Sequence, residues 1–117
     1  MLMGSLAAFT LVAVMGLMMI KDVWQGYPID PAYPRFHAGA ALFGSALVIT
    51  LAMDGDTRLY ANIGLAVAII LLGLAMSLKA RKGKRVPKSL LAAHAGLAVA
   101  CYGLLAYFAF NPQAALF

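Results

Sequence analysis

Four long apolar runs, separated by short polar segments, constrain the fold of this chain more than any other feature. A helix needs about 20 mostly apolar residues to cross the hydrocarbon core of a bilayer. The runs cover residues 2–20, 34–53, 59–78 and 87–110 and are nearly free of charge. A transmembrane β-barrel would show short alternating strands instead. The sequence therefore predicts an all-α integral membrane protein, a bundle of four transmembrane helices.

The composition points to lipid as the main solvent. The chain has 117 residues, of which 64% are hydrophobic and 11% charged, whereas soluble domains are about 25% charged. A soluble domain of this size buries only about two-thirds of the surface that its unfolded chain exposes. We therefore expect one membrane domain, residues 1–117. The first run lacks a preceding positive charge and a small-residue cleavage site before Lys21, so we read it as a helix of the mature protein.

The Lys and Arg residues predict the orientation in the membrane. Eight of the nine lie in segments 21–35 and 79–88, and only Arg58 lies between the second and third runs. Positive residues favour the cytoplasmic side. We therefore expect loops 21–35 and 79–88 in the cytoplasm and both termini in the periplasm, as for a bacterial inner-membrane protein. This topology also accounts for the net charge of +5, so nucleic acid is not expected as a partner.

Proline and cap residues predict where helices begin and end. Asp30 before Pro31 is typical of a helix start, so the second helix is expected to begin before its apolar run. Pro87 is expected to open the fourth helix, and Asn111–Pro112 to end it. The helix ends bear on the depth of the two histidines in the membrane.

The chain resembles itself when it is shifted by 57 positions. His37-Ala38-Gly39 then coincides with His94-Ala95-Gly96, and these are the two histidines of the chain. Other matches between positions 16 and 53 consist of Ala, Leu, Gly and Met, which are common in any membrane helix; among them are Gly16 with Gly73 and Gly26 with Gly83. The match predicts two tandem hairpin repeats of the same orientation, residues 1–57 and 58–117.

The two histidines are the candidate ligands of a haem b. An ionisable side chain inside a membrane helix marks a candidate functional site, and imidazole is a common ligand of haem iron. His37 follows Pro31 by six residues, about 9 Å of helix, and His94 follows Pro87 by seven, about 10 Å. If the second helix begins near Pro31, the two imidazoles lie at one depth and could hold one haem. A c-type attachment is excluded because no C-x-x-C-H motif occurs.

Two further sets of residues complete this prediction. Small side chains on the histidine faces leave room for the macrocycle: Ala40, Ala41, Gly44, Ala98 and Cys101. Basic side chains near the same membrane surface could pair with the haem propionates: Arg35, Lys79 and Lys88.

Other readings of the same residues stay open. Small residues also let membrane helices pack closely, and a histidine can hydrogen-bond to a neighbouring helix. The chain could then be a cofactor-free accessory subunit of a larger membrane complex, or hold a chlorin pigment or a quinone. An oligomeric transporter or channel is less favoured because all four aspartates, Asp22, Asp30, Asp54 and Asp56, are expected in loops.

No catalytic motif occurs, so we do not expect an enzyme by itself; an electron-transfer subunit of an oxidoreductase fits better. The expected partners are the lipid bilayer, other membrane subunits or further copies of the chain, and a quinone as electron partner.

Overall fold

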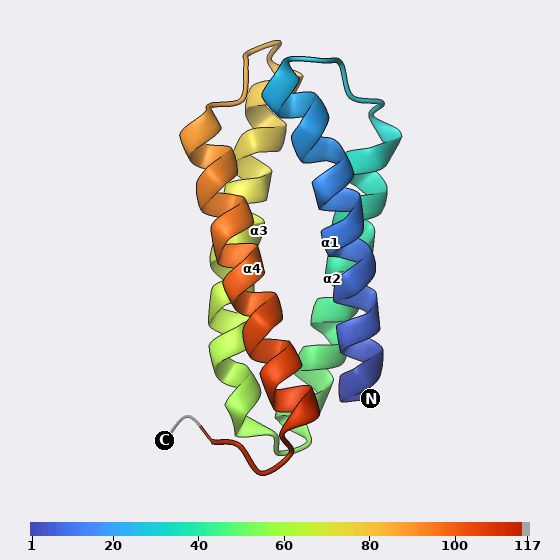
Figure 1. Cartoon of the computed structure of the whole chain (residues 1–117), viewed down its shortest axis with the longest axis vertical. Helices are drawn as coiled ribbons and strands as arrows, with labels where there is room; N and C mark the ends of the chain where they lie inside the picture. Colours follow the sequence, from blue (N-terminus) through green and yellow to red (C-terminus); the bar gives the residue numbers. More distant parts are fainter. Residues whose placement is uncertain (116–117) are drawn as a thin grey trace.

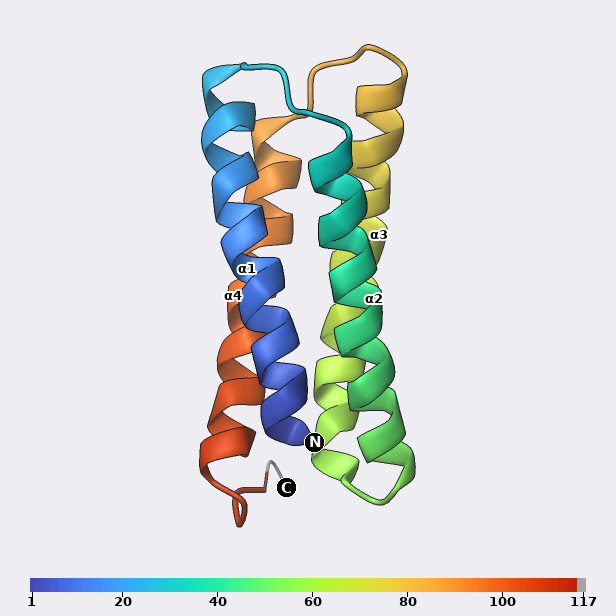
Figure 2. The ribbon, with the colours of Figure 1, turned by 90° about the vertical axis from the view of Figure 1, so that its right-hand side faces the viewer.

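The computed structural model describes residues 1–115, so the last two residues of the predicted domain lie outside the described part of the chain. The elements are α1 (Leu2–Gln25), α2 (Ala32–Met53), the 3₁₀ turn η1 (Thr57–Leu59), α3 (Tyr60–Arg81) and α4 (Lys88–Phe110). Helices α1 and α2 form one antiparallel hairpin, α3 and α4 form a second, and the hairpins stand side by side (Figures 1 and 2). All four helices are long and apolar enough to cross a membrane, which confirms the all-helical fold.

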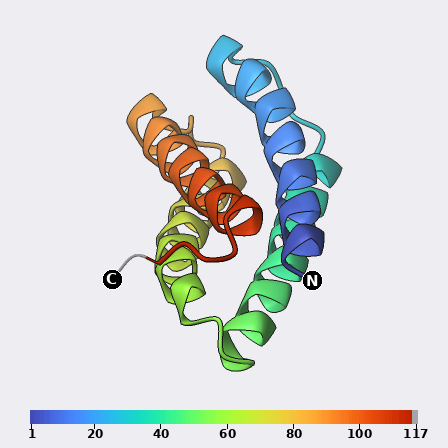
Figure 3. The same ribbon diagram turned by 60° about the horizontal axis from the view of Figure 1, so that its bottom comes forward.

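The bundle has two distinct ends. Connections 26–31 and 82–87 lie together at one end, which we call the loop end; the N-terminus, η1 and the segment after α4 lie at the other, the terminal end (Figure 1). Seen from near the terminal end, the two hairpins form separate layers (Figure 3).

Helices α1 and α3 extend past the predicted apolar runs. They continue to Gln25 and Arg81. A left-handed glycine follows each of them: Gly26 directly after α1 (φ 75°) and Gly83 after Lys82 (φ 69°). Only glycine adopts this left-handed conformation without a steric penalty, which is why it commonly follows a helix. Hydropathy locates the part of a helix that suits lipid, whereas the helix itself ends near a glycine with a left-handed backbone conformation.

The predicted loops 21–35 and 79–88 are therefore too long. The connections cover residues 26–31 and 82–87, because the flanking polar residues continue the helices. Lys21 and Asp22 lie in α1 and Arg35 lies in α2, so the expectation that every aspartate falls in a loop was wrong for Asp22. These residues still lie at the loop end of the bundle.

Helix α2 begins near Pro31, as the equal depth of the two histidines requires. Helix α2 begins at Ala32, before its apolar run, and the Ala32 N–H donates a 2.9 Å hydrogen bond to Oδ1 of Asp30. Helix α4 begins immediately after Pro87 and ends before Asn111. His37 is the sixth residue of α2 and His94 the seventh of α4. The two histidines are thus similarly placed from the starts of their helices.

The buried core lies at the terminal end and ties the hairpins together. Its residues come from α1, α2, η1 and α4: Leu6, Val48, Ala52, Leu59, Leu105 and Phe108. Toward the loop end, Leu91 is a buried hydrophobic side chain outside this cluster. Large apolar side chains cover much of the outer surface, including Phe36, Met53 and Val99. Such a surface suits lipid better than water.

Candidate functional site

The structure brings the two histidines together from different hairpins. The imidazole rings of His37 on α2 and His94 on α4 have centroids 6.4 Å apart, with their planes inclined at 56°. Both residues are half-buried. The sequence could place them at one depth, but only the packing of the hairpins turns them toward each other.

The ring of His94 is held against helix α3. Its Nδ1 lies 2.9 Å from the carbonyl oxygen of Ile69, and its Cε1 lies close to Gly73, where an added Cβ would be 3.1 Å away. A carbonyl only accepts hydrogen bonds, so Nδ1 carries the proton and donates it. In a neutral imidazole the other nitrogen, Nε2, is then unprotonated and free to bind a metal.

His37 repeats this contact 57 residues earlier. Its Cε1 lies against Gly16 of α1, where an added Cβ would be 3.3 Å away. Val12 precedes Gly16 by four residues, as Ile69 precedes Gly73. Nδ1 of His37 is buried and stands outside hydrogen-bonding geometry. The two imidazoles thus share a glycine contact and differ in whether Nδ1 is bonded.

The small residues predicted around a macrocycle divide into two groups. Ala40, Ala41 and Ala98 are half-buried on the histidine-bearing helices. Gly44 instead accommodates Phe9 of α1, whose Cε2 would lie 3.0 Å from an added Cβ. Cys101 contacts α3, because the Asn62 side-chain amide donates a 2.9 Å hydrogen bond to its carbonyl. Gly44 and Cys101 therefore contact helices of their own hairpins.

The predicted propionate partners are exposed at the loop end. Arg35, Lys79 and Lys88 are all solvent-accessible there. Lys88 Nζ lies 4.6 Å from the centroid of the Trp24 ring, so it joins the end of α1 to the start of α4. Such a cation–π contact is worth about 0.5–1 kcal/mol at exposed sites. Pairing of these cations with propionates stays a prediction.

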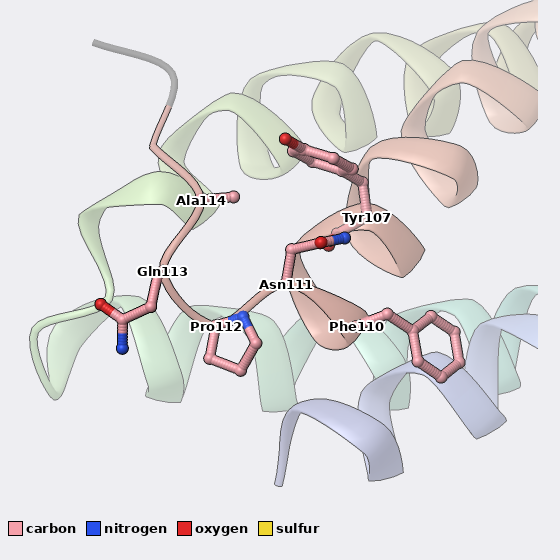
Figure 4. Close-up of a pocket in the computed structure, with 6 residues that line it drawn as sticks. All are labelled: Tyr107, Phe110, Asn111, Pro112, Gln113 and Ala114. Atoms are coloured by element: carbon pink, nitrogen blue, oxygen red, sulfur yellow. The ribbon is translucent and has the colours of Figure 1, made fainter.

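Two cavities open on the surface of the bundle, one distant from the histidine pair and one nearer to it. A shallow one of about 430 Å³ lies at the terminal end, lined by Tyr107, Phe110, Asn111, Pro112, Gln113 and Ala114 (Figure 4). A smaller one of about 270 Å³ lies between the ends of α1 and α2, lined by Met18, Met19, Asp22, Ile29, Asp30 and Tyr33. Tyr33 precedes His37 by one helical turn, so the smaller cavity is the nearer one to the histidines.

The glycines beside the imidazoles are the site residues that sequence reasoning missed. Gly16 and Gly73 entered the sequence comparison only as repeat matches. The signal was available: Gly16 precedes His37 by 21 residues, and Gly73 precedes His94 by the same 21. The shared spacing pairs each glycine with the histidine of its own hairpin, whereas the Ala and Leu matches involve no candidate ligand.

Comparison with known proteins adds no relative: no family model, no curated protein and no solved structure matches the chain. Within residues 1–115, no three His, Cys, Asp or Glu side chains gather in a metal-binding arrangement. A structural zinc site needs four protein ligands and a catalytic one about three. Two imidazoles suffice for an iron whose four other ligands come from a porphyrin.

Proposed function

We propose that the chain is a membrane-embedded b-type cytochrome, an electron-transfer protein or subunit that holds one haem between His37 and His94. The observation that carries the proposal is the 6.4 Å between the ring centroids. Imidazole nitrogen bonds a first-row metal at about 2 Å, so nitrogens on opposite sides of one ion are about 4 Å apart and their ring centroids roughly 6 Å apart. The rings are spaced as a single ion between them would require.

The hydrogen bond of His94 supports the same proposal. Metal-bound histidines usually donate their second ring N–H to a carbonyl or carboxylate, which fixes the tautomer and the ring orientation. The bond from His94 Nδ1 to the Ile69 carbonyl is of this kind. It leaves Nε2 as the metal-binding atom before any cofactor arrives.

The position of the core favours a ring between the hairpins. The residues of the hydrophobic cluster lie at the terminal end, whereas the histidines lie toward the loop end. A flat macrocycle near the histidines would therefore displace few buried contacts. Ala40, Ala41 and Ala98, which are half-buried on the histidine-bearing helices, add little bulk there.

The residues define what such a site could do. A bound haem would supply one-electron exchange between ferric and ferrous iron. His37 and His94 would both bind the iron and so would leave no site for oxygen, which favours electron transfer over oxygen activation. The apolar helices exclude water, and the loop-end cations Arg35, Lys79 and Lys88 would attract propionates or an anionic partner.

The proposal includes the membrane in which the chain lies, its orientation and the relation between the two hairpins. We place the chain in a bacterial inner membrane with connections 26–31 and 82–87 in the cytoplasm, because eight of the nine Lys and Arg residues lie near them. The two hairpins are proposed to be tandem repeats. The glycine–histidine contacts and the left-handed Gly26 and Gly83 recur at the same shift of 57 residues. A quinone or a neighbouring subunit is the proposed electron partner.

A reduced-minus-oxidised visible spectrum of detergent-purified protein, expressed with haem supplied, tests the proposal. We expect a sharp b-type band at about one haem per chain, lost in both His37→Ala and His94→Ala. Gly39→Ala and Gly96→Ala are matched controls, since each lies two residues from a histidine and an added Cβ meets nothing within 4 Å. A featureless spectrum from folded wild-type protein would overturn the proposal.

The second candidate function is a cofactor-free accessory subunit. One observation favours it: His94 already donates to Ile69, and a hydrogen bond between helices is a sufficient role for a histidine in a membrane. This reading expects colourless protein whose stability depends on a partner subunit. It also expects His94→Asn, which keeps an amide donor, to retain most of the stability.

A further inference from the structure

We propose that Gly73 is a positioning residue, which opens the Ile69 carbonyl to His94 and thereby selects the nitrogen that faces the iron, and that Gly16 allows His37 the same close approach to its own hairpin. The consequence for haem rests on the proposed function. The contact itself belongs to the protein without cofactor and can be tested there.

Helix geometry explains why a glycine is needed at these positions. In an α-helix the N–H of residue i bonds the carbonyl of residue i−4, and that oxygen keeps a second lone pair. The Cβ of residue i tilts toward the helix N-terminus and covers the preceding turn. A side chain at 73 would therefore screen the carbonyl of Ile69. Without one, the imidazole of His94 reaches that oxygen at 2.9 Å.

The same arrangement recurs in the first hairpin. Gly16 follows Val12 by four residues, as Gly73 follows Ile69, and each glycine touches the Cε1 side of its histidine. The other helical glycines differ: Gly44 packs against Phe9, and an added Cβ at Gly4, Gly39, Gly64, Gly96 or Gly103 meets nothing within 4 Å. Close packing of glycine against an imidazole is thus confined to these two positions.

The effect of an alanine substitution should differ between Gly73 and Gly16. An added Cβ would lie 3.1 Å from His94 Cε1 at Gly73 and 3.3 Å from His37 Cε1 at Gly16. His94 is also the ring whose Nδ1 is hydrogen-bonded, whereas His37 Nδ1 has no hydrogen-bond partner among residues 1–115. Alanine at 73 must push the ring away from its acceptor, while alanine at 16 displaces a ring that has no such bond to lose. We therefore expect the larger effect from Gly73→Ala.

Nitrogen-15 NMR of histidine-labelled protein without haem tests the contact directly. We expect His94 in the wild type to be a single tautomer protonated at Nδ1, and Gly73→Ala to give a mixture of tautomers. Gly64→Ala on the same helix α3 is the matched control, and Gly4→Ala serves for Gly16→Ala on α1. Both controls should leave the histidine signals unchanged.

Haem titration of the same variants tests the consequence. Mutation of a group that holds a metal ligand typically weakens metal binding about 10- to 100-fold, so we expect a loss of that size for Gly73→Ala and a smaller loss for Gly16→Ala. The reduction potential of the haem should rise in Gly73→Ala, because an imidazole without its acceptor is a weaker donor to ferric iron. Gly64→Ala should match the wild type in both measurements.

The outcomes separate this proposal from the proposed function. Wild-type His94 protonated at Nε2 would overturn the positioning role, whether or not Gly73→Ala folds. Equal NMR spectra for Gly73→Ala and Gly64→Ala would overturn it too. A wild type that takes up no haem while showing the Nδ1-protonated tautomer would refute the cytochrome and retain the positioning role of the glycines.

Discussion

The hydroxyl oxygens of Thr10 on α1 and Tyr102 on α4 lie 2.7 Å apart and form a hydrogen bond between the two hairpins. Thr10 also donates to the carbonyl of Leu6 at 2.8 Å. A hydroxyl has one proton to give, so Tyr102 donates to Thr10. The direction of this bond determines which of the two residues can be replaced at lower cost.

Tyr102→Phe and Thr10→Val should therefore differ. The first removes a donor and leaves Thr10 bonded to Leu6, so we expect a loss of about 0.6 kcal/mol, as for other bonds between membrane helices. The second leaves the Tyr102 hydroxyl without its acceptor, and we expect about 1 kcal/mol or more. Unfolding in mixed micelles of the single and double variants measures both. Strictly additive effects would show that the two hydroxyls are not coupled.

Gly26, directly after α1, and Gly83, two residues after the end of α3, adopt the left-handed conformation. Alanine at either position should destabilise the protein by about 1 kcal/mol, because a Cβ is disfavoured at φ of 75° and 69°. Gly39→Ala, inside a helix and with open space around it, should be neutral or stabilising. Thermal or denaturant unfolding compares the three variants. If Gly26→Ala and Gly83→Ala are as stable as the control, the left-handed conformation of these two glycines is contradicted.

Arg58 holds the segment after α4 against the loop between the hairpins. Its guanidinium makes two 2.8 Å hydrogen bonds to Asp56, lies 5.0 Å from the Phe108 ring centroid, and donates to three backbone carbonyls, those of Asn111, Pro112 and Ala114. A Lys has no planar set of donors to do this. We expect both Arg58→Lys and Arg58→Ala to speed hydrogen exchange in residues 111–115.

The contacts through which Arg58 holds the segment after α4 should weaken in acid. The hydrogen bonds from Arg58 lower the pKa of Asp56 below its ordinary 3.8. A carboxylate with a lowered pKa contributes stability above its unfolded value, and that contribution is lost as the pH falls through the folded value. The protection of residues 111–115 against hydrogen exchange, relative to the intrinsic exchange rate at each pH, should therefore fall in the wild type as the pH drops below 3.8 through the lowered pKa. Asp56→Asn should already exchange faster at neutral pH, and Asp54→Asn is the control.

The charge distribution predicts which end of the bundle faces the cytoplasm. In a Cys101→Ala background, Lys84→Cys marks the loop end, while Asp54→Cys and Gln113→Cys mark the terminal end. A membrane-impermeant maleimide added to intact spheroplasts should label the two terminal-end cysteines and reach Lys84→Cys only after permeabilisation. The opposite labelling pattern would reverse the orientation, and partial labelling of both ends would indicate dual topology.

Much of the fold could be predicted from the chain because each helix is a continuous stretch of apolar side chains. The number of helices and the ends of α4 at Pro87 and Asn111 followed directly. The ends of α1 and α3 did not, since Lys21 and Asp22 were read as a loop. Charged residues at the lipid boundary are compatible with helix and with loop alike, and the helix stops only at a glycine that can turn left-handed.

The candidate site was predictable only in part. His37 and His94 were recognisable because they are the two histidines of the chain and share a neighbourhood. Gly44 and Cys101 were expected beside them from helical spacing, yet they contact Phe9 and Asn62 within their own hairpins. Helical spacing gives the face of a helix on which a residue lies; the rotation of that face relative to other helices depends on side-chain packing along the whole bundle.

The sequence by itself determined the number of helices, their order and the spacing of each histidine from Pro31 or Pro87, because these depend on local hydropathy, on cap residues and on the constant rise of a helix. Tertiary structure alone decided that the two imidazoles lie 6.4 Å apart and that His94 bonds the Ile69 carbonyl. Those distances depend on how α2 packs beside α4 and how His94 packs against α3. Each such contact joins residues far apart along the chain, where local periodicity carries no information.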